Sequence, residues 1–333
     1  MATIAVPTLL VVGALLAVQA AANVQMSTTM RSPLGAATLQ LGLAAALLLL
    51  AAVLAGSVVG VDALSAVPVW HLLGGLGSAV YITAGILLMP RLGAVVTVGS
   101  FITGQMLASL VLDSAGLLGV PAEPMGTATA LGALAVLLGA GLIVRAQTRA
   151  AAVPTPAAAP AGVDRRPGHA APTRPTPAGR PRWRVGWFAV GVLGGAVLPV
   201  QGATNALLRG DLGPPLTVAM ISFVVATAAT AVVLAAAVWF ARATPPQLGR
   251  LRSMPWWGWL GALVGAGYVT TVFLLLPQIG AAPTIALTVA GQQLAGLAVD
   301  QYGLLRLPRR PVSAPRLLGV AVLLLGVGLL QLV

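Results

Sequence analysis

The chain of 333 residues is 58% hydrophobic and only 7% charged, and its mean hydropathy is +0.98. These values lie far outside the range of soluble globular proteins, so they exclude a fold built around a core in water and indicate an integral membrane protein. The sequence contains no Cys and no Walker, HExxH or GxSxG motif. It therefore offers no basis for disulfides, thiolate metal sites, or hydrolase and ATPase chemistry, and we expect neither a metal nor a cofactor.

Apolar runs follow one another along the chain. Each is long enough for a helix to cross about 30 Å of hydrocarbon, and none alternates polar and apolar residues as outer-membrane strands do. The first run resembles a secretory signal at "AVQAAA", but no Lys or Arg precedes it, so we interpret it as a retained helix. We predict an all-α membrane protein with ten transmembrane helices, at about residues 3–24, 34–56, 67–89, 92–112, 125–144, 185–206, 215–240, 256–276, 279–299 and 315–333.

The segment 146–184, between the fifth and sixth runs, differs in composition from the rest of the chain. It is rich in Pro, Ala and Arg. Such a segment cannot bury enough apolar surface to offset the entropy lost on ordering. We therefore predict a disordered linker that separates a first unit, 1–145, from a second unit, 185–333.

The two units are related by an internal duplication. The stretches "VQAAAN" and "VQGATN" lie 182 residues apart, and after a five-residue insertion the matches continue at a distance of 187. Composition bias can match scattered Gly, Ala and Leu, but it does not make Gln, Asn, Tyr and Asp recur in one register. The matched polar residues are Gln19 and Gln201, Asn23 and Asn205, Tyr81 and Tyr268, Gln105 and Gln292, and Asp113 and Asp300.

The distribution of Arg predicts how the chain is oriented. Each unit holds an odd number of predicted spans, so the second unit enters the membrane from the opposite side and the repeats are inverted. All 18 basic residues are Arg, and only Arg209 falls on the side opposite the linker. Because Lys and Arg gather in cytoplasmic loops, we expect a cytoplasmic linker and external termini. Arg beside membrane ends favours contact with anionic lipid headgroups over contact with nucleic acid.

Several blocks of sequence resemble a known transporter family. The first unit has the Gln and Asn pair followed by "SPL", then "PRLGA", "GQ" and a D-x-x-G block, and the second has "PPL" and "PQIGAAPTIALTVAGQQLAGLAVDQYGLL". In these blocks the chain resembles the YdcZ-type branch of the drug/metabolite transporter (DMT) superfamily, which is similar to EamA-type permeases. The resemblance covers nearly all the spans but not the linker. It implies a ten-helix, inverted-repeat exporter of the bacterial inner membrane, which some relatives assemble from two five-helix chains and which is fused here.

Polar side chains inside the spans are the candidates for a substrate path. In hydrocarbon a side-chain amide needs a partner, which is either a neighbouring helix or a water-filled cavity. A tyrosine at mid-span likewise either bonds a neighbouring helix or faces a substrate. Both interpretations stay open for Gln19 and Asn23 on one helix face, for Gln201 and Asn205 on another, for Gln105 and Gln292, which each follow a Gly, and for Tyr81 and Tyr268.

Asp113 and Asp300 are the paired carboxylates, and each lies near the end of its predicted helix. One interpretation is that they cap the turns that lead to Gly116 and Gly303. The other is a proton or cation relay at the mouth of a cavity. The sequence places no acid and no His near a predicted mid-membrane position, so strongly proton-coupled transport would need these two residues.

Together these features predict a secondary transporter and not an enzyme. Substrate would bind between the two repeats and be exposed to each side in turn, and export follows from the family resemblance. No Arg falls deep within the spans, which favours a small neutral, zwitterionic or amphipathic metabolite or drug. A channel or lipid-scrambling protein and a non-transporting scaffold are the alternatives, and a homodimer stays open.

The predicted topology can be tested with single Cys residues in this Cys-free chain. Ala2→Cys should react with an impermeant thiol reagent on intact cells, whereas Ala158→Cys should react only after the membrane is permeabilised. Labelling of Ala158→Cys from outside would show that the orientation is reversed.

Overall fold

The computed structural model describes residues 2–58, 61–119, 122, 126–152, 182–279 and 281–330. These residues are helical or lie in turns and loops between helices, which confirms the all-α prediction. Most of the predicted linker, residues 153–181, lies outside the described residues. At its edges the structure differs from the prediction, because the fifth long helix continues to Ala152 and the sixth begins at Arg182.

The long helices of both units occur in the predicted order. In the first unit they are α1 (Ala2–Met30), α2 (Pro33–Leu54), α5 (Gly75–Leu92), α6 (Ala94–Ala115) and α7 (Thr127–Ala152), with the short α3 (Val61–Ser65) and α4 (Val69–Leu72) before α5. In the second unit they are α8 (Arg182–Leu212), α9 (Pro215–Trp239), α10 (Leu260–Ile279), α11 (Ala281–Tyr302) and α12 (Ala314–Leu330), with 3₁₀ turns at Leu248–Ser253, Trp256–Trp259 and Leu304–Arg306.

Length and hydropathy identify membrane spans among these helices. Within the described residues, seven helices are long and apolar enough to cross a membrane, and Ala314–Leu329 is a shorter apolar helix. The outer surface fits such an environment, because Leu131, Leu134 and Leu138 on α7 are each more than half exposed. A stripe of exposed leucine is costly in water but neutral in lipid.

Local sequence explains where several helices begin and end. Ser32 caps α2, since its Oγ accepts a hydrogen bond from the Gly35 N–H at 3.1 Å, and Pro33 occupies the first turn, where its missing N–H costs nothing. Gly116 ends α6 and Gly303 follows α11, both in the left-handed region, with φ of 61° and 64°. Glycine adopts this conformation without the steric cost of a Cβ.

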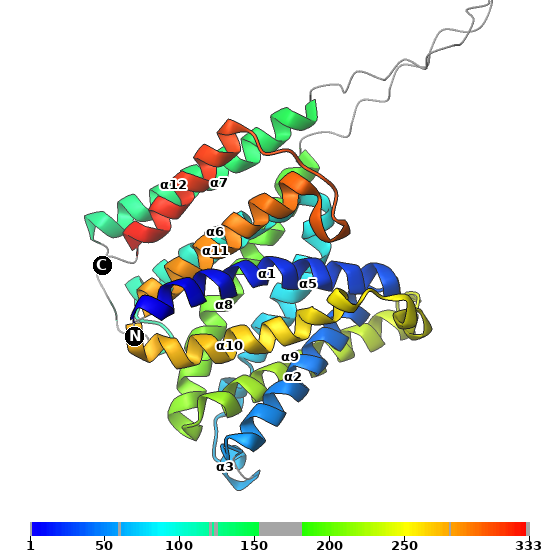
Figure 1. Ribbon diagram of the computed structural model, residues 1–333. Coiled ribbons are helices and arrows are strands. Elements are labelled where there is room, and N and C mark those ends of the chain that lie inside the picture. Colours follow the sequence, from blue (N-terminus) through cyan, green and yellow to red (C-terminus); the bar gives the residue numbers. More distant parts are fainter. Residues whose placement is uncertain are drawn as a thin grey trace, which may run out of the picture.

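The two units interlock, as Figure 1 shows. The first helix of each unit packs against the third and fourth long helices of the other, so that α1 contacts α10 and α11, and α8 contacts α5 and α6. Around this centre α2 pairs with α9, and α7 pairs with α12. Corresponding helices therefore make corresponding contacts.

Glycine residues allow the central helices to cross in close contact. A Cβ at Gly104 in α6 would fall on the backbone carbonyl of Val192 in α8, and a Cβ at Gly291 in α11 would fall on that of Leu10 in α1. Gly104 and Gly291 are matched by the duplication, and so are Val192 and Leu10. Small residues at helix interfaces of membrane proteins let backbones approach in this way.

The close helix crossings predict that a methyl group added at one of them lowers the stability of the protein. Gly104→Ala places a methyl group against the α8 backbone and should reduce the free energy of unfolding in detergent by about 1–3 kcal/mol, the usual cost of overpacking. Gly202→Ala is the matched control, because a Cβ there meets nothing within 4 Å. Equal stability of the two variants would contradict the close crossing.

Candidate functional site

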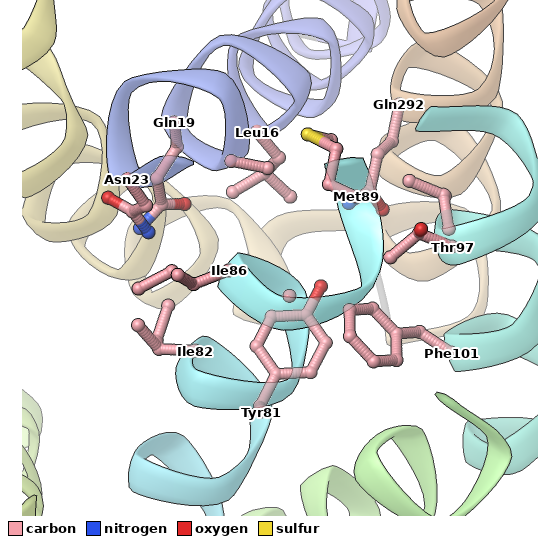
Figure 2. A pocket seen from close by; sticks show the side chains of 13 residues that line it. Leu16, Gln19, Asn23, Tyr81, Ile82, Ile86, Met89, Thr97, Phe101 and Gln292 are labelled. Atoms are coloured by element: carbon pink, nitrogen blue, oxygen red, sulfur yellow. The ribbon is translucent and has the colours of Figure 1, made fainter. Parts of the chain in front are cut away.

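A cavity of about 30 Å³ lies between α1, α5, α6 and α11, so both units contribute to its wall (Figure 2). Its polar lining consists of Gln19 and Asn23 from α1, Tyr81 from α5, Thr97 from α6 and Gln292 from α11. Four of these five are residues that the sequence singles out, and they come from three helices that are distant along the chain. Thr97 is also repeated, as Thr284, but the polar candidates chosen from the duplication did not include a threonine.

Aromatic and apolar side chains form the rest of the wall. The rings of Tyr81 and Phe101 pack at a centroid distance of 4.4 Å and an interplanar angle of 41°. The Tyr81 hydroxyl points away from α5 toward the side chain of Gln292, with which it interacts (Figure 2). The cavity thus combines a flat aromatic surface with amide and hydroxyl groups, a pairing that suits small organic ligands.

A second, smaller cavity of about 10 Å³ lies on the other side of the same α1 residues. Gln19 and Asn23 line both cavities, and the second is completed by Gln40 from α2, Phe223 from α9 and residues of α10. The Gln40 Nε2 donates to the backbone carbonyl of Gly258 at 3.2 Å, which orients its Oε1. Selection of amides by their repetition misses Gln40, because its counterpart is a serine. Its position as a Gln inside an apolar run is the signal that could have found it.

Several polar atoms at these cavities are buried without a hydrogen-bond partner among the described residues. They are Asn23 Oδ1, Gln40 Oε1 and Thr97 Oγ1, in side chains that are at most 3% exposed. Leaving such an atom unpaired costs on the order of 1–3 kcal/mol, so buried polar atoms are generally satisfied by protein, water or ligand. Their clustering around one pair of cavities makes these cavities the candidate binding site.

The other predicted residues lie apart from these cavities. Gln201 and Ser78 exchange hydrogen bonds at 2.8 and 3.1 Å, and Asn205 accepts one from Ser222 at 2.8 Å. Gln201 and Asn205 therefore join α8 to α5 and α9. Two further candidates are absent from the lining of both cavities: Gln105, which is half-buried in α6, and Tyr268, which interacts with Thr288 of α11.

Asp300 lies in a buried polar cluster at one end of the helices. Its carboxylate accepts hydrogen bonds from the N–H groups of Ala94 and Val95 at 2.8 and 3.2 Å and pairs with the Arg316 guanidinium at 2.6 Å. It thus caps the N-terminus of α6 in the other unit, where a negative charge is favourable, and not the turn at the end of its own helix. Asp113 has an exposed side chain at the opposite end of α6.

A contact between a histidine and an aspartate joins the two units at the opposite end of the helices from Asp300. His71 Nδ1 in α4 lies 2.5 Å from Asp211 Oδ2 in α8. His71 is buried, and its ring stacks edge-on against Trp70 at 4.0 Å. The neighbouring Trp70 suggests an interfacial position for His71, but sequence gives no indication of its acidic partner in the other unit.

Long apolar helices around an uncharged polar cavity define a multi-pass membrane protein. The family model described as "Putative inner membrane exporter, YdcZ" matches residues 4–142 and 186–329. The chain therefore belongs to the DMT_YdcZ family, with both units matched and the segment between them left out. No curated protein is matched by the chain. The family is one of exporters and not of enzymes, which confirms the resemblance seen in the sequence.

The buried pair of Asp300 and Arg316 predicts a large effect of a small substitution. Asp300→Asn leaves the Arg316 guanidinium, in a side chain that is 3% exposed, without its counter-charge. The free energy of unfolding in detergent should fall by about 3–5 kcal/mol, as is usual when one partner of a buried pair is removed.

Asp113→Asn is the control for this substitution, because it makes the same chemical change at the matched position of the first unit, where the side chain is exposed. It should change stability by less than about 1 kcal/mol. A similar effect of both substitutions would contradict a special role of the Asp300 cluster in stability.

Proposed function

We propose that the chain is a secondary transporter that exports a small neutral, zwitterionic or amphipathic metabolite or drug. The observation that carries this proposal is the uncharged polar cavity, to which helices of both units contribute. Transporters with inverted repeats bind substrate at the interface between the repeats and alternate access by moving one part against the other. Membership of an exporter family supports the direction of transport.

The arrangement of the helices supports alternating access between two inverted five-helix repeats. Equivalent helices cross at equivalent glycines, Gly104 with α8 and Gly291 with α1, so the units can exchange roles with little change in local packing. The cavity of about 30 Å³ has room for roughly one or two water molecules. A metabolite therefore enters only when helices separate, which favours a gated transporter over an open pore.

Polar contacts between the units lie where gates would be needed. At one end His71 contacts Asp211, and at the other the N–H groups of Ala94 and Val95 donate to Asp300, which Arg316 of its own unit holds in place. Breaking the contacts at one end while those at the other persist would open one side only. In this proposal Asp300 is a gate and a helix cap, and flux measured with and without a pH gradient tests whether Asp113 and Asp300 also relay protons.

The chemistry of the lining supports the class of substrate. Of the described residues that line the two cavities, none is Asp, Glu, Lys or Arg. A buried ion without a counter-charge is strongly unfavourable, whereas a neutral molecule or a zwitterion with its own paired charges needs only hydrogen bonds. We propose Gln19, Asn23, Tyr81 and Gln292 as the substrate contacts.

The proposal also includes the orientation in the bacterial inner membrane. The segment 146–184 is a cytoplasmic tether between the repeats 1–145 and 185–333, and both termini are external, as the distribution of Arg predicts. Arg residues at the cytoplasmic face contact anionic lipid headgroups.

Reconstituted vesicles loaded with a metabolite pool test the function. We expect saturable flux of a limited set of solutes, reduced about fivefold or more by Gln292→Leu, which removes the amide at similar bulk and so loses hydrogen bonds of roughly 1 kcal/mol each. Gln105→Leu, outside the cavities, should have a smaller effect.

Leu134→Met on the exposed face of α7 is the control and should leave flux per folded molecule unchanged. Flux that never saturates, or movement of lipid, would identify a channel or scrambling protein. Absence of any flux would favour a scaffold whose linker binds a partner.

A further inference from the structure

The same pair of amides is used differently in the two units. In α8 both members have partners: Gln201 exchanges hydrogen bonds with Ser78 of α5, and Asn205 accepts one from Ser222 of α9. This clamp is formed entirely by protein groups. It leaves neither amide oxygen in need of a ligand.

The equivalent residues around α1 differ at both partner positions. The counterpart of Ser78 is Gly265, and the counterpart of Ser222 is Gln40. The geometry is otherwise retained, because a Cβ at Gly265 would lie 2.6 Å from Gln19 Nε2, where the Ser78 side chain meets Gln201 in the other unit. Gln19 therefore lies over a glycine and lacks the hydroxyl that holds its counterpart.

Gln40 occupies the position that Ser222 occupies in the second unit, and this difference leaves two hydrogen-bond acceptors unpaired. Gln40 donates its amide N–H to Gly258, so its Oε1 is available, and Asn23 Oδ1 lies beside it over Gly261. Both oxygens are buried, and neither has a hydrogen-bond partner among the described residues. The second cavity is bounded by both side chains and by Gln19, so the unpaired acceptors face the same space.

We propose that the substrate site is asymmetric: Gln19, Asn23 and Gln40 bind the ligand, whereas Gln201 and Asn205 form a permanent clamp between helices. The two cavities on either side of Gln19 and Asn23 are one site divided by these flexible side chains. This inference rests on the proposed transport function and assigns the site within it.

The unpaired atoms specify the ligand. Two carbonyl oxygens that lack donors require a molecule with at least two N–H or O–H groups, and the absence of charged residues from the described lining requires that this part be uncharged. The Tyr81 and Phe101 rings offer a surface for its flat or apolar part. The ligand class is therefore an uncharged or internally neutral compound with several donors, such as an amide or a polyol joined to an apolar group.

Exchanging the partners between the units tests the asymmetry. Gly265→Ser gives Gln19 the hydroxyl that holds Gln201, and since only the end of a flexible side chain must move, the protein should still fold. Flux of the metabolite pool per folded molecule should fall about fivefold or more, the effect of occupying a hydrogen-bonding group of the site. The solutes lost should be uncharged or zwitterionic donors.

Ser78→Gly is the matched control and releases Gln201 from its clamp. It should lower thermal stability while leaving flux per folded molecule within about twofold of wild type, because Ser78 lies outside both cavities. Equal flux of Gly265→Ser and wild type, an equal loss in both variants, or loss of charged solutes alone would overturn the proposed site.

A second measurement needs no substrate. In the Cys-free chain, Gln19→Cys should react with N-ethylmaleimide about tenfold faster than Gln201→Cys, because Gln19 lines both cavities, which the proposed alternation would open to solvent, whereas Gln201 lines neither. Equal or reversed rates would overturn the asymmetry. If wild-type vesicles show no flux, the transport function fails, and the labelling rates still decide which amides line an accessible site.

Discussion

One constraint underlies this structure: polar groups within the membrane spans need hydrogen-bond partners where water is scarce. Helices satisfy their own backbone, so each side-chain amide within them must find a protein group or a ligand. Gln201 and Asn205 find serine hydroxyl groups on neighbouring helices. Asn23 and Gln40 retain unpaired oxygens at two cavities. The difference between paired and unpaired amides thus follows from which residues face them and not from their own identity.

Close helix packing provides the frame for these contacts. In lipid, apolar surface gives little drive for helices to associate, so packing of small residues has to hold them together. Gly104 and Gly291 bring α6 and α11 onto α8 and α1 from the other unit. Polar contacts lie at both ends: Asp300 pairs with Arg316 and caps the first turn of α6 at one end, and His71 contacts Asp211 at the other. A closely packed centre with polar contacts at its two ends supports the alternating access proposed for this chain.

The family was predicted from motifs that resemble it, whereas composition and repetition were enough to predict an all-helical membrane protein, because lipid restricts the available folds so strongly. They also selected Gln19, Asn23, Tyr81 and Gln292, which line the cavity. Repetition was less useful for the rest of the site, since a duplicated residue is retained for packing as readily as for binding. It favoured Gln105, which lies elsewhere, and passed over Gln40, whose counterpart is Ser222. Thr97 is repeated as Thr284, so repetition offered a signal there that was not used.

The first helix of each unit packs against helices of the other unit, and this arrangement has a consequence for synthesis in the cell. The α1 helix leaves the ribosome first, yet the helices it packs against, α10 and α11, are among the last to emerge. The surface of α1 that later contacts Gly291, and its amides, therefore stay without their partners in the bilayer while most of the chain is translated. Insertion machinery or a transient neighbour that shields this helix would therefore govern the yield of assembled protein, and delay near the end of translation would leave the first unit exposed to misassembly.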